Sequence, residues 1–301
     1  MRDGGGLIKP QLLKSMKKIN SIFAAILVVC FYACGSDDGG ETPGGGNTET
    51  ITIPTTGFTS PTSYPNMTLA WEDDFDGAVL NSAHWTHETG TGSNGWGNAE
   101  LQYYRSENTT LQDGHLIITA KEESFSGSNY TSSRIISKDK QEFRYGRIDI
   151  RAALPQGKGM WPALWMLGAN IDQVGWPACG EIDIMEKVGG TGIENEIHGT
   201  VHWQSGGNHA NFGRSTNLST NTTNQFHVYS IEWTSTAIRW MVDGVEYNVI
   251  DTIPADLDEF RRGFFFIMNV AVGGNWPGDP NASTSFPQHM IVDYVRVFQA
   301  N

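Results

Sequence analysis

From residue 68 onward, apolar and polar residues alternate in short runs that turn residues separate. Such alternation is typical of β-strands that bury one face. The alternating runs span residues 115–123, 144–155, 180–186, 195–203, 226–234, 237–250 and 290–299. Asp113-Gly114 precedes the first run and Asp243-Gly244 divides the sixth, and both dipeptides favour tight turns. Residues 262–274 are almost continuously apolar, which predicts a central strand buried on both faces.

These runs predict about a dozen strands and one short helical segment, Ala255–Arg261. Strands that follow one another without intervening helices favour an all-β sandwich of two antiparallel sheets over a parallel α/β fold. When two packed sheets curve, the concave face of one forms a groove. We therefore expect a single large domain with a cleft on one sheet.

The residues before this domain have a different character. Lys17 and Lys18 precede an apolar stretch, 22–32, that is short for a membrane span and has the shape of a signal peptide. The stretch ends at Ala33-Cys34 and resembles a bacterial lipoprotein signal, in which Cys34 is lipidated. A plain cleaved signal peptide and a single anchor helix are the alternatives.

The chain is thus predicted to have three parts. Residues 1–33 are an upstream extension and a lipoprotein signal peptide, and residues 34–63 are a flexible tether rich in Gly, Thr and Pro. Residues 64–301 are the folded domain. Asp37-Asp38 resembles a surface-export signal of some bacterial lipoproteins, which predicts a secreted protein held by its lipid at the bacterial outer membrane.

Composition narrows the choice of ligand. The net charge of -13 argues against nucleic acid and, more weakly, against an anionic polysaccharide, so a neutral ligand fits better. The 10 tryptophans suit both a core and a cleft that stacks sugar rings. Of the three cysteines, only Cys179 lies beyond Cys34, so the domain has no internal disulfide. We expect a buried, unreactive thiol there, and a monomer.

Residues 180–186 are the candidate catalytic segment, because this run carries three acids. In a strand, side chains alternate between faces, so Glu181 and Asp183 point the same way. A regular strand would turn Glu186 to the other face, because two apolar residues, Ile184 and Met185, stand between it and Asp183. One β-bulge at Ile184-Met185 would bring all three acids to one face.

Three acids on one face repel one another and raise at least one pKa. Glycoside hydrolysis uses this property, because one carboxyl must be protonated to donate and another ionised to attack. Retaining enzymes hold these carboxyls roughly 5–5.5 Å apart, whereas Glu181 and Glu186 begin about 13 Å apart along a strand, so their side chains must lean together. The spacing alone leaves a solvated acidic strand or a cation site as alternatives.

The surrounding residues resemble the laminarinase-like β-glucanases of glycoside hydrolase family 16. The matching segments, in family order, are WEDDFDG (71–77), GWGNAELQYY (95–104), FRYGRIDIRAALPQGKGMWPALWMLG (143–168), WPACGEIDIMEKVGG (176–190), HGTVHW (198–203), FHVYSIEWT (226–234), VDG (242–244), NVAVGGNWPG (269–278) and DYVRVF (293–298). The resemblance implies a β-jelly-roll sandwich and a retaining endo-hydrolase of β-1,3-glucan. It assigns Glu181 as nucleophile, Glu186 as acid/base and Asp183 as the assisting acid. A mixed-linkage β-1,3-1,4-glucanase, a transglycosylase and a non-catalytic glucan-binding protein are the rivals.

The same resemblance implies a set of substrate-binding residues. Trp161 and Trp165 are expected to stack sugars, and Asn98 to bind sugar from a strand face shared with Glu100 and Gln102. The other expected substrate-binding residues are Arg134, His202 in contact with Glu186, Trp276 and Gln288.

A structural calcium site is also implied, away from the cleft. Its expected ligands are Glu72, the Gly114 carbonyl and Asp293, since oxygen ligands suit this cation. No cofactor is expected for catalysis.

Overall fold

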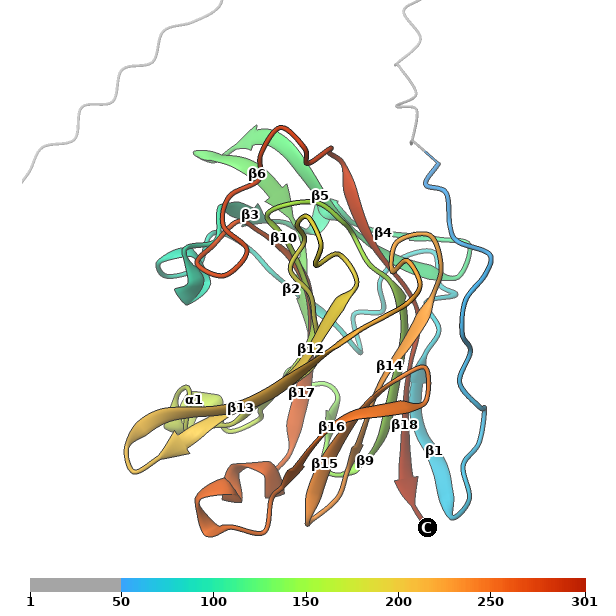
Figure 1. Ribbon diagram of the computed structural model, residues 1–301, viewed down its shortest axis with the longest axis vertical. Coiled ribbons are helices and arrows are strands. Elements are labelled where there is room, and N and C mark those ends of the chain that lie inside the picture. The colour runs from blue at the N-terminus through green and yellow to red at the C-terminus, as the bar shows by residue number, and fades with distance from the viewer. Residues whose placement is uncertain (1–49) are drawn as a thin grey trace, which may run out of the picture. The chain divides into compact units, whose positions relative to one another are not determined.

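Two β-sheets packed face to face form the framework of residues 50–301, the part of the chain that the computed structural model describes (Figure 1). The predicted signal peptide and Cys34 lie outside the described residues. The two sheets confirm the predicted all-β jelly-roll sandwich. No helix within residues 50–301 is long and apolar enough to cross a membrane.

The larger sheet has 10 strands, and its neighbours are antiparallel except for the pair β3–β6. Its order is β16 (Val245–Asp251), β15 (Ala237–Val242), β14 (His227–Trp233), β9 (Gly146–Ala153), β18 (Gln288–Ala300), β5 (His115–Phe125), β6 (Ser128–Ser132) and β3 (Gln102–Tyr104), with β1 (Met67–Asp73) beside β18 and β4 (Thr109–Gln112) beside β5.

The smaller sheet has 8 strands and carries the acidic segment. Its order is β13 (Asn208–Asn217), β12 (Glu196–Ser205), β11 (Glu181–Glu186), β10 (Met160–Gly168), β17 (Phe264–Val272), β7 (Arg134–Ile136) and β2 (Thr86–Glu88), with β8 (Glu142–Phe143) beside β17. The helical elements are short: η1 (Gly95–Ala99), η2 (Ser106–Asn108), α1 (Ile171–Val174) and η3 (Ala255–Arg261). The last matches the predicted helical segment.

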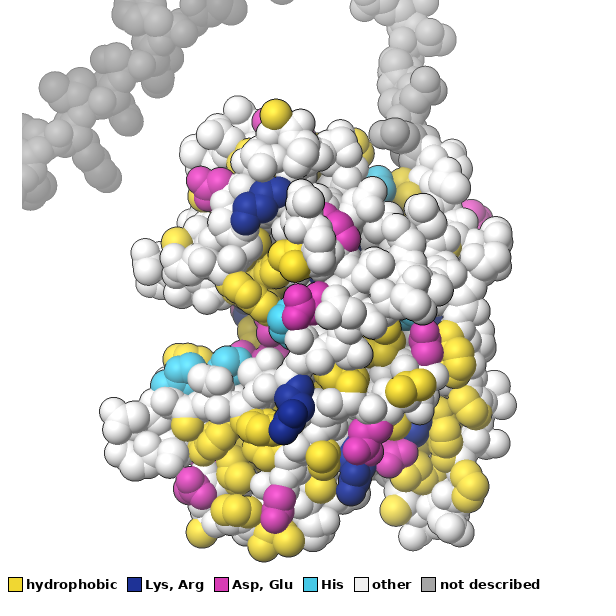
Figure 2. Space-filling model, viewed as in Figure 1, with side chains coloured by type: hydrophobic (Ala, Val, Ile, Leu, Met, Phe, Trp, Pro, Cys, Tyr) yellow, Lys and Arg dark blue, Asp and Glu magenta, His cyan; other side chains and the backbone are white. Residues whose placement is uncertain are grey.

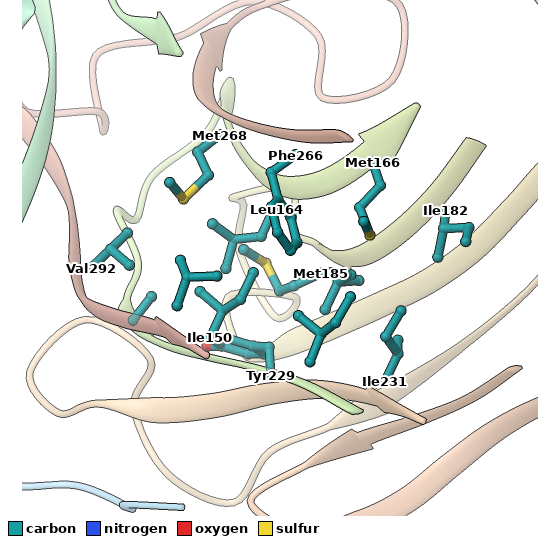
Figure 3. Close-up of a cluster of buried hydrophobic side chains, with 14 of the residues drawn as sticks. Ile150, Leu164, Met166, Ile182, Met185, Tyr229, Ile231, Phe266, Met268 and Val292 are labelled. Carbon is teal, nitrogen blue, oxygen red and sulfur yellow. The ribbon is translucent and has the colours of Figure 1, made fainter. Parts of the chain in front are cut away.

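Apolar side chains from both sheets meet in one core (Figure 3). Every residue of β17 is buried, which confirms the strand predicted from residues 262–274. In Figure 3, Leu164 and Met185 of the smaller sheet lie opposite Ile150 and Tyr229 of the larger one. Because this interior is continuous, truncating one of its large side chains to alanine should lower stability by about 2–5 kcal/mol.

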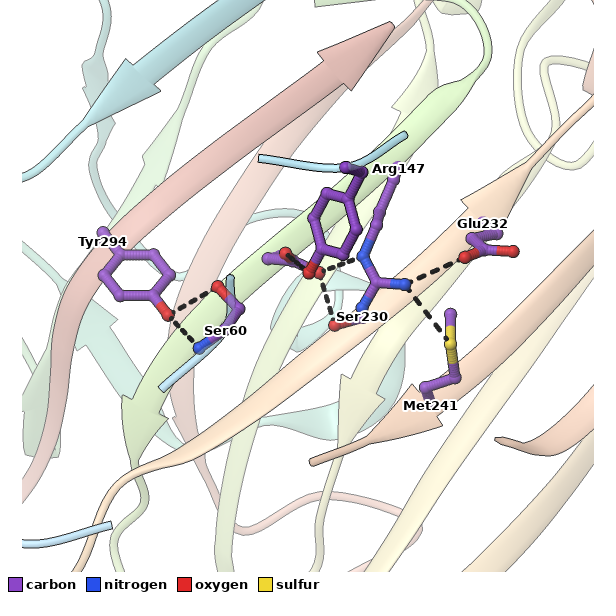
Figure 4. Close-up of polar contacts among 8 residues, drawn as sticks. Ser60, Arg147, Ser230, Glu232, Met241 and Tyr294 are labelled. Carbon is purple, nitrogen blue, oxygen red and sulfur yellow. Dashed lines mark hydrogen bonds and ion pairs between the residues drawn. The ribbon is translucent and has the colours of Figure 1, made fainter. Parts of the chain in front are cut away.

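Residues 50–63, predicted as tether, instead pack along the larger sheet. Ile51 and Ile53 contact a small buried cluster, and Gly57 forms a β-bridge with Phe226. Ser60 is 4% exposed, and its backbone N–H donates to the Tyr294 hydroxyl at 3.0 Å (Figure 4). The predicted domain boundary at residue 64 is therefore wrong, because these contacts extend the folded unit back to residue 50.

Tyr64, directly after this segment, helps to cover a charged pair on the outer face of the larger sheet. Arg147 donates to Asp149 at 2.9 Å, and Asp149 is fully buried (Figure 4). Tyr64 and Ser230 each donate a hydroxyl to Asp149, both at 2.7 Å. A buried charge needs such partners, since leaving it unpaired is strongly destabilising.

Removing residues 1–63 should lower the free energy of unfolding by about 2–4 kcal/mol relative to a chain lacking only residues 1–49, because the isoleucine burial and the Ser60 hydrogen bonds are lost. Urea unfolding of both truncated chains measures the difference. Equal unfolding midpoints would show that the segment adds no stability.

Candidate active site

A cleft of about 830 Å³ opens on the face of the smaller sheet that points away from the core. In Figure 2 it is the hollow at the left of the view, with histidine side chains along its lower edge. Its walls come from β10, β11, β12, β13 and β17, together with the turn at residues 96–100 and Trp276. All three acids of β11 line it.

The strand register places the three acids on one face. Glu181, Asp183 and Glu186 pair with residues 167, 165 and 163 of β10 and with residues 202, 200 and 198 of β12. On each neighbouring strand, successive partners are two residues apart and therefore point to the same face of the sheet. The three acids opposite them also point to one face, although the acids are two and then three residues apart in sequence. The register shifts between Asp183 and Glu186, and both Ile184 and Met185 are buried. This confirms the predicted bulge.

Each glutamate accepts a hydrogen bond from an indole. Trp176 donates Nε1–H to Glu181 Oε2 at 2.9 Å, and Trp161 donates to Glu186 Oε1 at 3.0 Å. Trp176 was not among the predicted site residues, although it is 50% exposed and lies five residues before Glu181 in sequence. An exposed tryptophan beside a candidate nucleophile is the signal that would have pointed to it.

His202 lies beside Asp183 and Glu181 rather than Glu186. Its Nε2 is 3.2 Å from Asp183 Oδ2 and 3.7 Å from Glu181 Oε1. The expected contact with Glu186 is wrong because the register places His198, four residues before His202 on β12, opposite that acid.

Burial is the main cause that raises the pKa of all three acids. The Asp183 charge raises the pKa of Glu181 and of Glu186 further, while His202 and an indole donor lower both. We infer that the three carboxyls together keep at least one proton near neutral pH, because three adjacent buried anions are unfavourable. The site thus holds a carboxyl that can donate and one that can attack.

Aromatic rings continue from the acids along the cleft floor. Trp161 and Trp165 lie on β10 next to β11 in the same sheet, and both line the cleft. Trp276 is 42% exposed and meets Trp161 edge to face, with ring centroids 5.5 Å apart. These faces suit the stacking of sugar rings.

Arg134 does not point its donors freely into the cleft. Its guanidinium lies between the rings of Trp96 and Trp165, 4.5 and 4.9 Å from their centroids, and donates to Glu88 at 2.5 Å. Such cation–π contacts fix the two rings relative to each other. Its place in the cleft lining agrees with the prediction, but its contacts are those of a residue that positions the rings.

Asn98 lines the cleft from a turn and not from a strand. It lies in η1, where Trp96 has a left-handed backbone, and its amide donates to Glu100 Oε1 at 3.0 Å. Gln102 is on β3 and fully buried. The expected shared strand face is therefore wrong, because the left-handed residues interrupt the strand before Gln102.

Gln288 is not among the residues that line the cleft. It begins β18, donates to the Ser285 carbonyl at 2.7 Å and accepts from the backbone N–H of Gln156 at 3.0 Å. These bonds tie two loops together, which corrects its predicted substrate-binding role.

The two carboxylates among the predicted calcium ligands have other partners. Asp293 accepts from Arg151 at 2.6 Å, and Glu72 is 3.4 Å from Arg296. The backbone at Gly114 forms a left-handed turn before β5. Because arginines already neutralise both carboxylates, this donor set does not fit a calcium ion as arranged, and the site stays a prediction.

An open cleft with aromatic faces and a row of acids at its floor defines a glycoside hydrolase that works with two carboxylates. The profile of glycosyl hydrolases family 16 matches residues 96–296, and the chain belongs to that family.

Characterised relatives support this membership. A β-glucanase of Rhodothermus marinus is 44% identical over 255 residues, which cover 78% of this chain and 86% of the relative. The clotting factor G alpha subunit of Tachypleus tridentatus is 42% identical over 242 residues, covering 78% of this chain but 34% of that protein, so the chain spans about a third of its length. The laminarinase catalytic domain of Thermotoga maritima superposes with a TM-score of 0.72 at 43% identity, covering 79% of this chain and all of that one.

Asp183→Asn should move the alkaline limb of the pH profile of kcat/KM to lower pH by about one unit. The Asp183 charge raises the pKa of Glu186, so its removal lets Glu186 lose its proton at lower pH. The profile is measured on a soluble β-glucan. Asp258→Asn, outside the cleft, is the control and should leave both limbs in place; an unmoved alkaline limb in Asp183→Asn contradicts the coupling.

Proposed function

We propose that this chain hydrolyses β-1,3-glucan at internal bonds by a retaining double displacement. Glu181 is the nucleophile, Glu186 the acid/base and Asp183 the acid that couples them. The observation that carries this proposal is the bulged register of β11, which brings the three acids to one face of the cleft.

The first step forms a bond from Glu181 to the anomeric carbon while Glu186 gives its proton to the leaving glycosidic oxygen. The hydrogen bond from Trp176 and the nearness of His202 favour the ionised form of Glu181. In the second step Glu186, now ionised, takes a proton from water as that water attacks the same carbon and releases Glu181. Two inversions leave the anomeric configuration unchanged.

Cleavage at internal bonds is supported by aromatic rings at both ends of the acid row. Trp176 lies at the Glu181 end, where its indole bonds that acid. Trp161 and Trp276 lie at the Glu186 end. Sugar-stacking surfaces on both sides of the reacting bond suit a polymer that extends past the site in both directions.

The substrate is inferred from the relatives and from charge. A β-glucanase and a laminarinase domain are among the proteins most similar to this chain, and the net charge of -13 suits a neutral polymer. Parallel product analysis on laminarin, barley β-glucan, lichenan and agarose tests the linkage. Faster release from barley glucan than from laminarin would favour the mixed-linkage alternative.

Glu181→Ala and Glu186→Ala should each lower kcat on laminarin by about 10²–10⁴-fold, because each removes a group that exchanges a proton or a bond with the sugar. Glu246→Ala, at an exposed position of β16, is the matched control. Reducing-sugar release measures turnover, and azide should restore cleavage in Glu181→Ala with an α-glycosyl azide product. Near-normal turnover in either cleft variant contradicts the assignment.

We also propose that Cys34 carries a lipid that holds the mature protein at the bacterial outer membrane. The sequence pattern of residues 16–34 supports this, and these residues lie outside the described part of the chain. Cys34→Ser should release the protein from the membrane fraction and abolish incorporation of labelled palmitate. Unchanged membrane association and labelling would refute the anchor.

A further inference from the structure

We propose that Glu181, Asp183 and His202 form an inhibitory binding site for a divalent transition-metal ion, best matched by zinc. One ligand atom from each of the three lies within 4.8 Å of the others. Within residues 50–301, no other group of three such side chains comes this close. The inference goes beyond the proposed hydrolysis, because the ion binds side chains of the active site without taking part in the reaction.

The distances between the donor atoms fit a tetrahedral ion. Zinc with bonds of about 2.0–2.1 Å holds neighbouring ligand atoms roughly 3.3 Å apart. His202 Nε2 stands 3.2 Å from Asp183 Oδ2 and 3.7 Å from Glu181 Oε1. Both distances from the imidazole are close to that value, and the ligand atoms of the two carboxylates lie within 4.8 Å of each other, so modest side-chain movements would let all three share one ion. All three side chains line the cleft, so water could supply a fourth ligand.

The donor set favours zinc over calcium. Imidazole nitrogen and carboxylate oxygen are both zinc ligands, whereas calcium takes six to eight ligands that are all oxygen. Asp183 is 2% exposed, and apart from His202 its Oδ2 has no partner among residues 50–301. A buried carboxylate oxygen with this unused capacity is a ready ligand.

Neighbouring side chains already hold the ligands in the required orientation. His202 Nδ1 is 2.9 Å from His209 Nε2, and the two rings stack with centroids 5.1 Å apart. This contact occupies Nδ1 and leaves Nε2 directed at the acids. Trp176 likewise binds Glu181 Oε2 and leaves Oε1 toward His202. Partners of this kind usually strengthen metal binding, and their loss weakens it about 10–100-fold.

An ion bound here would engage the carboxylate proposed to attack the sugar. Zinc should therefore inhibit hydrolysis in competition with the glucan, and a chelator should restore it. Inhibition rests on the proposed function, whereas binding of the ion does not.

Calorimetric titration of the full chain with zinc chloride tests the site directly. We expect one zinc ion bound at the cleft with micromolar affinity, weakened at least 100-fold by His202→Gln or Glu181→Gln and about 10–100-fold by His209→Gln. His115→Gln is the matched control: its Nε2 faces Asp293 at 3.6 Å but no third ligand joins them, so zinc affinity should not change.

The proposal is overturned if the wild-type chain binds no zinc below millimolar concentration, or if both His202→Gln and Glu181→Gln bind it as tightly as the wild type does. Thermal unfolding with and without zinc gives a second readout, and the zinc-induced rise in Tm should disappear in both variants. Zinc binding without hydrolysis of any glucan would overturn the proposed function alone; hydrolysis without zinc binding would overturn the metal site alone.

Discussion

One extra residue in β11 is the constraint on which the site depends. Without the bulge between Asp183 and Glu186, alternation along the strand would turn Glu186 into the core and leave the cleft with two acids. The bulge is held because both Ile184 and Met185 are buried in the interface between the sheets. Core packing thus sets the direction of a catalytic side chain on the opposite face of the sheet.

Placing three buried carboxylates side by side is energetically unfavourable, and hydrogen-bond donors in the cleft offset part of this cost. Burial raises the pKa of each carboxyl, and the Asp183 charge raises the pKa of Glu181 and of Glu186 further, while two indole N–H groups and His202 favour the ionised forms of these two glutamates. The same closeness that keeps one proton in the site also spaces an imidazole and two carboxylates as a zinc ion requires. In this structure, proton sharing and metal binding are therefore two consequences of one arrangement.

Much of this arrangement could be predicted from the sequence. The alternating runs predicted the principal strands. The spacing of the acids in residues 181–186 predicted the bulge, because successive side chains of a strand point to opposite faces. Contacts between distant segments could not be predicted this way. The cleft wall formed by β13 was missed because its residues are polar on both faces and show no alternation.

Residues 50–63 and Arg134 were misjudged for related reasons. The first segment is rich in Thr and Pro, yet Ile51, Ile53 and Ser60 suffice to dock it on a sheet whose outer face is visible only once folded. Arg134 was expected to donate hydrogen bonds to sugar, but its guanidinium lies over the ring of Trp96. Trp96 is placed there by a left-handed turn, which the pattern of apolar and polar residues does not predict.

The most direct measurement of the central claim is the identity of the residue that becomes bonded to the sugar. A 2-deoxy-2-fluoro-laminaribiosyl fluoride slows the second step of a retaining enzyme, so the covalent intermediate accumulates and can be located by mass spectrometry of its peptides. The account predicts one fluorinated laminaribiosyl group per chain, attached to Glu181. A label on Asp183 or Glu186, or turnover without any covalent adduct, would contradict it.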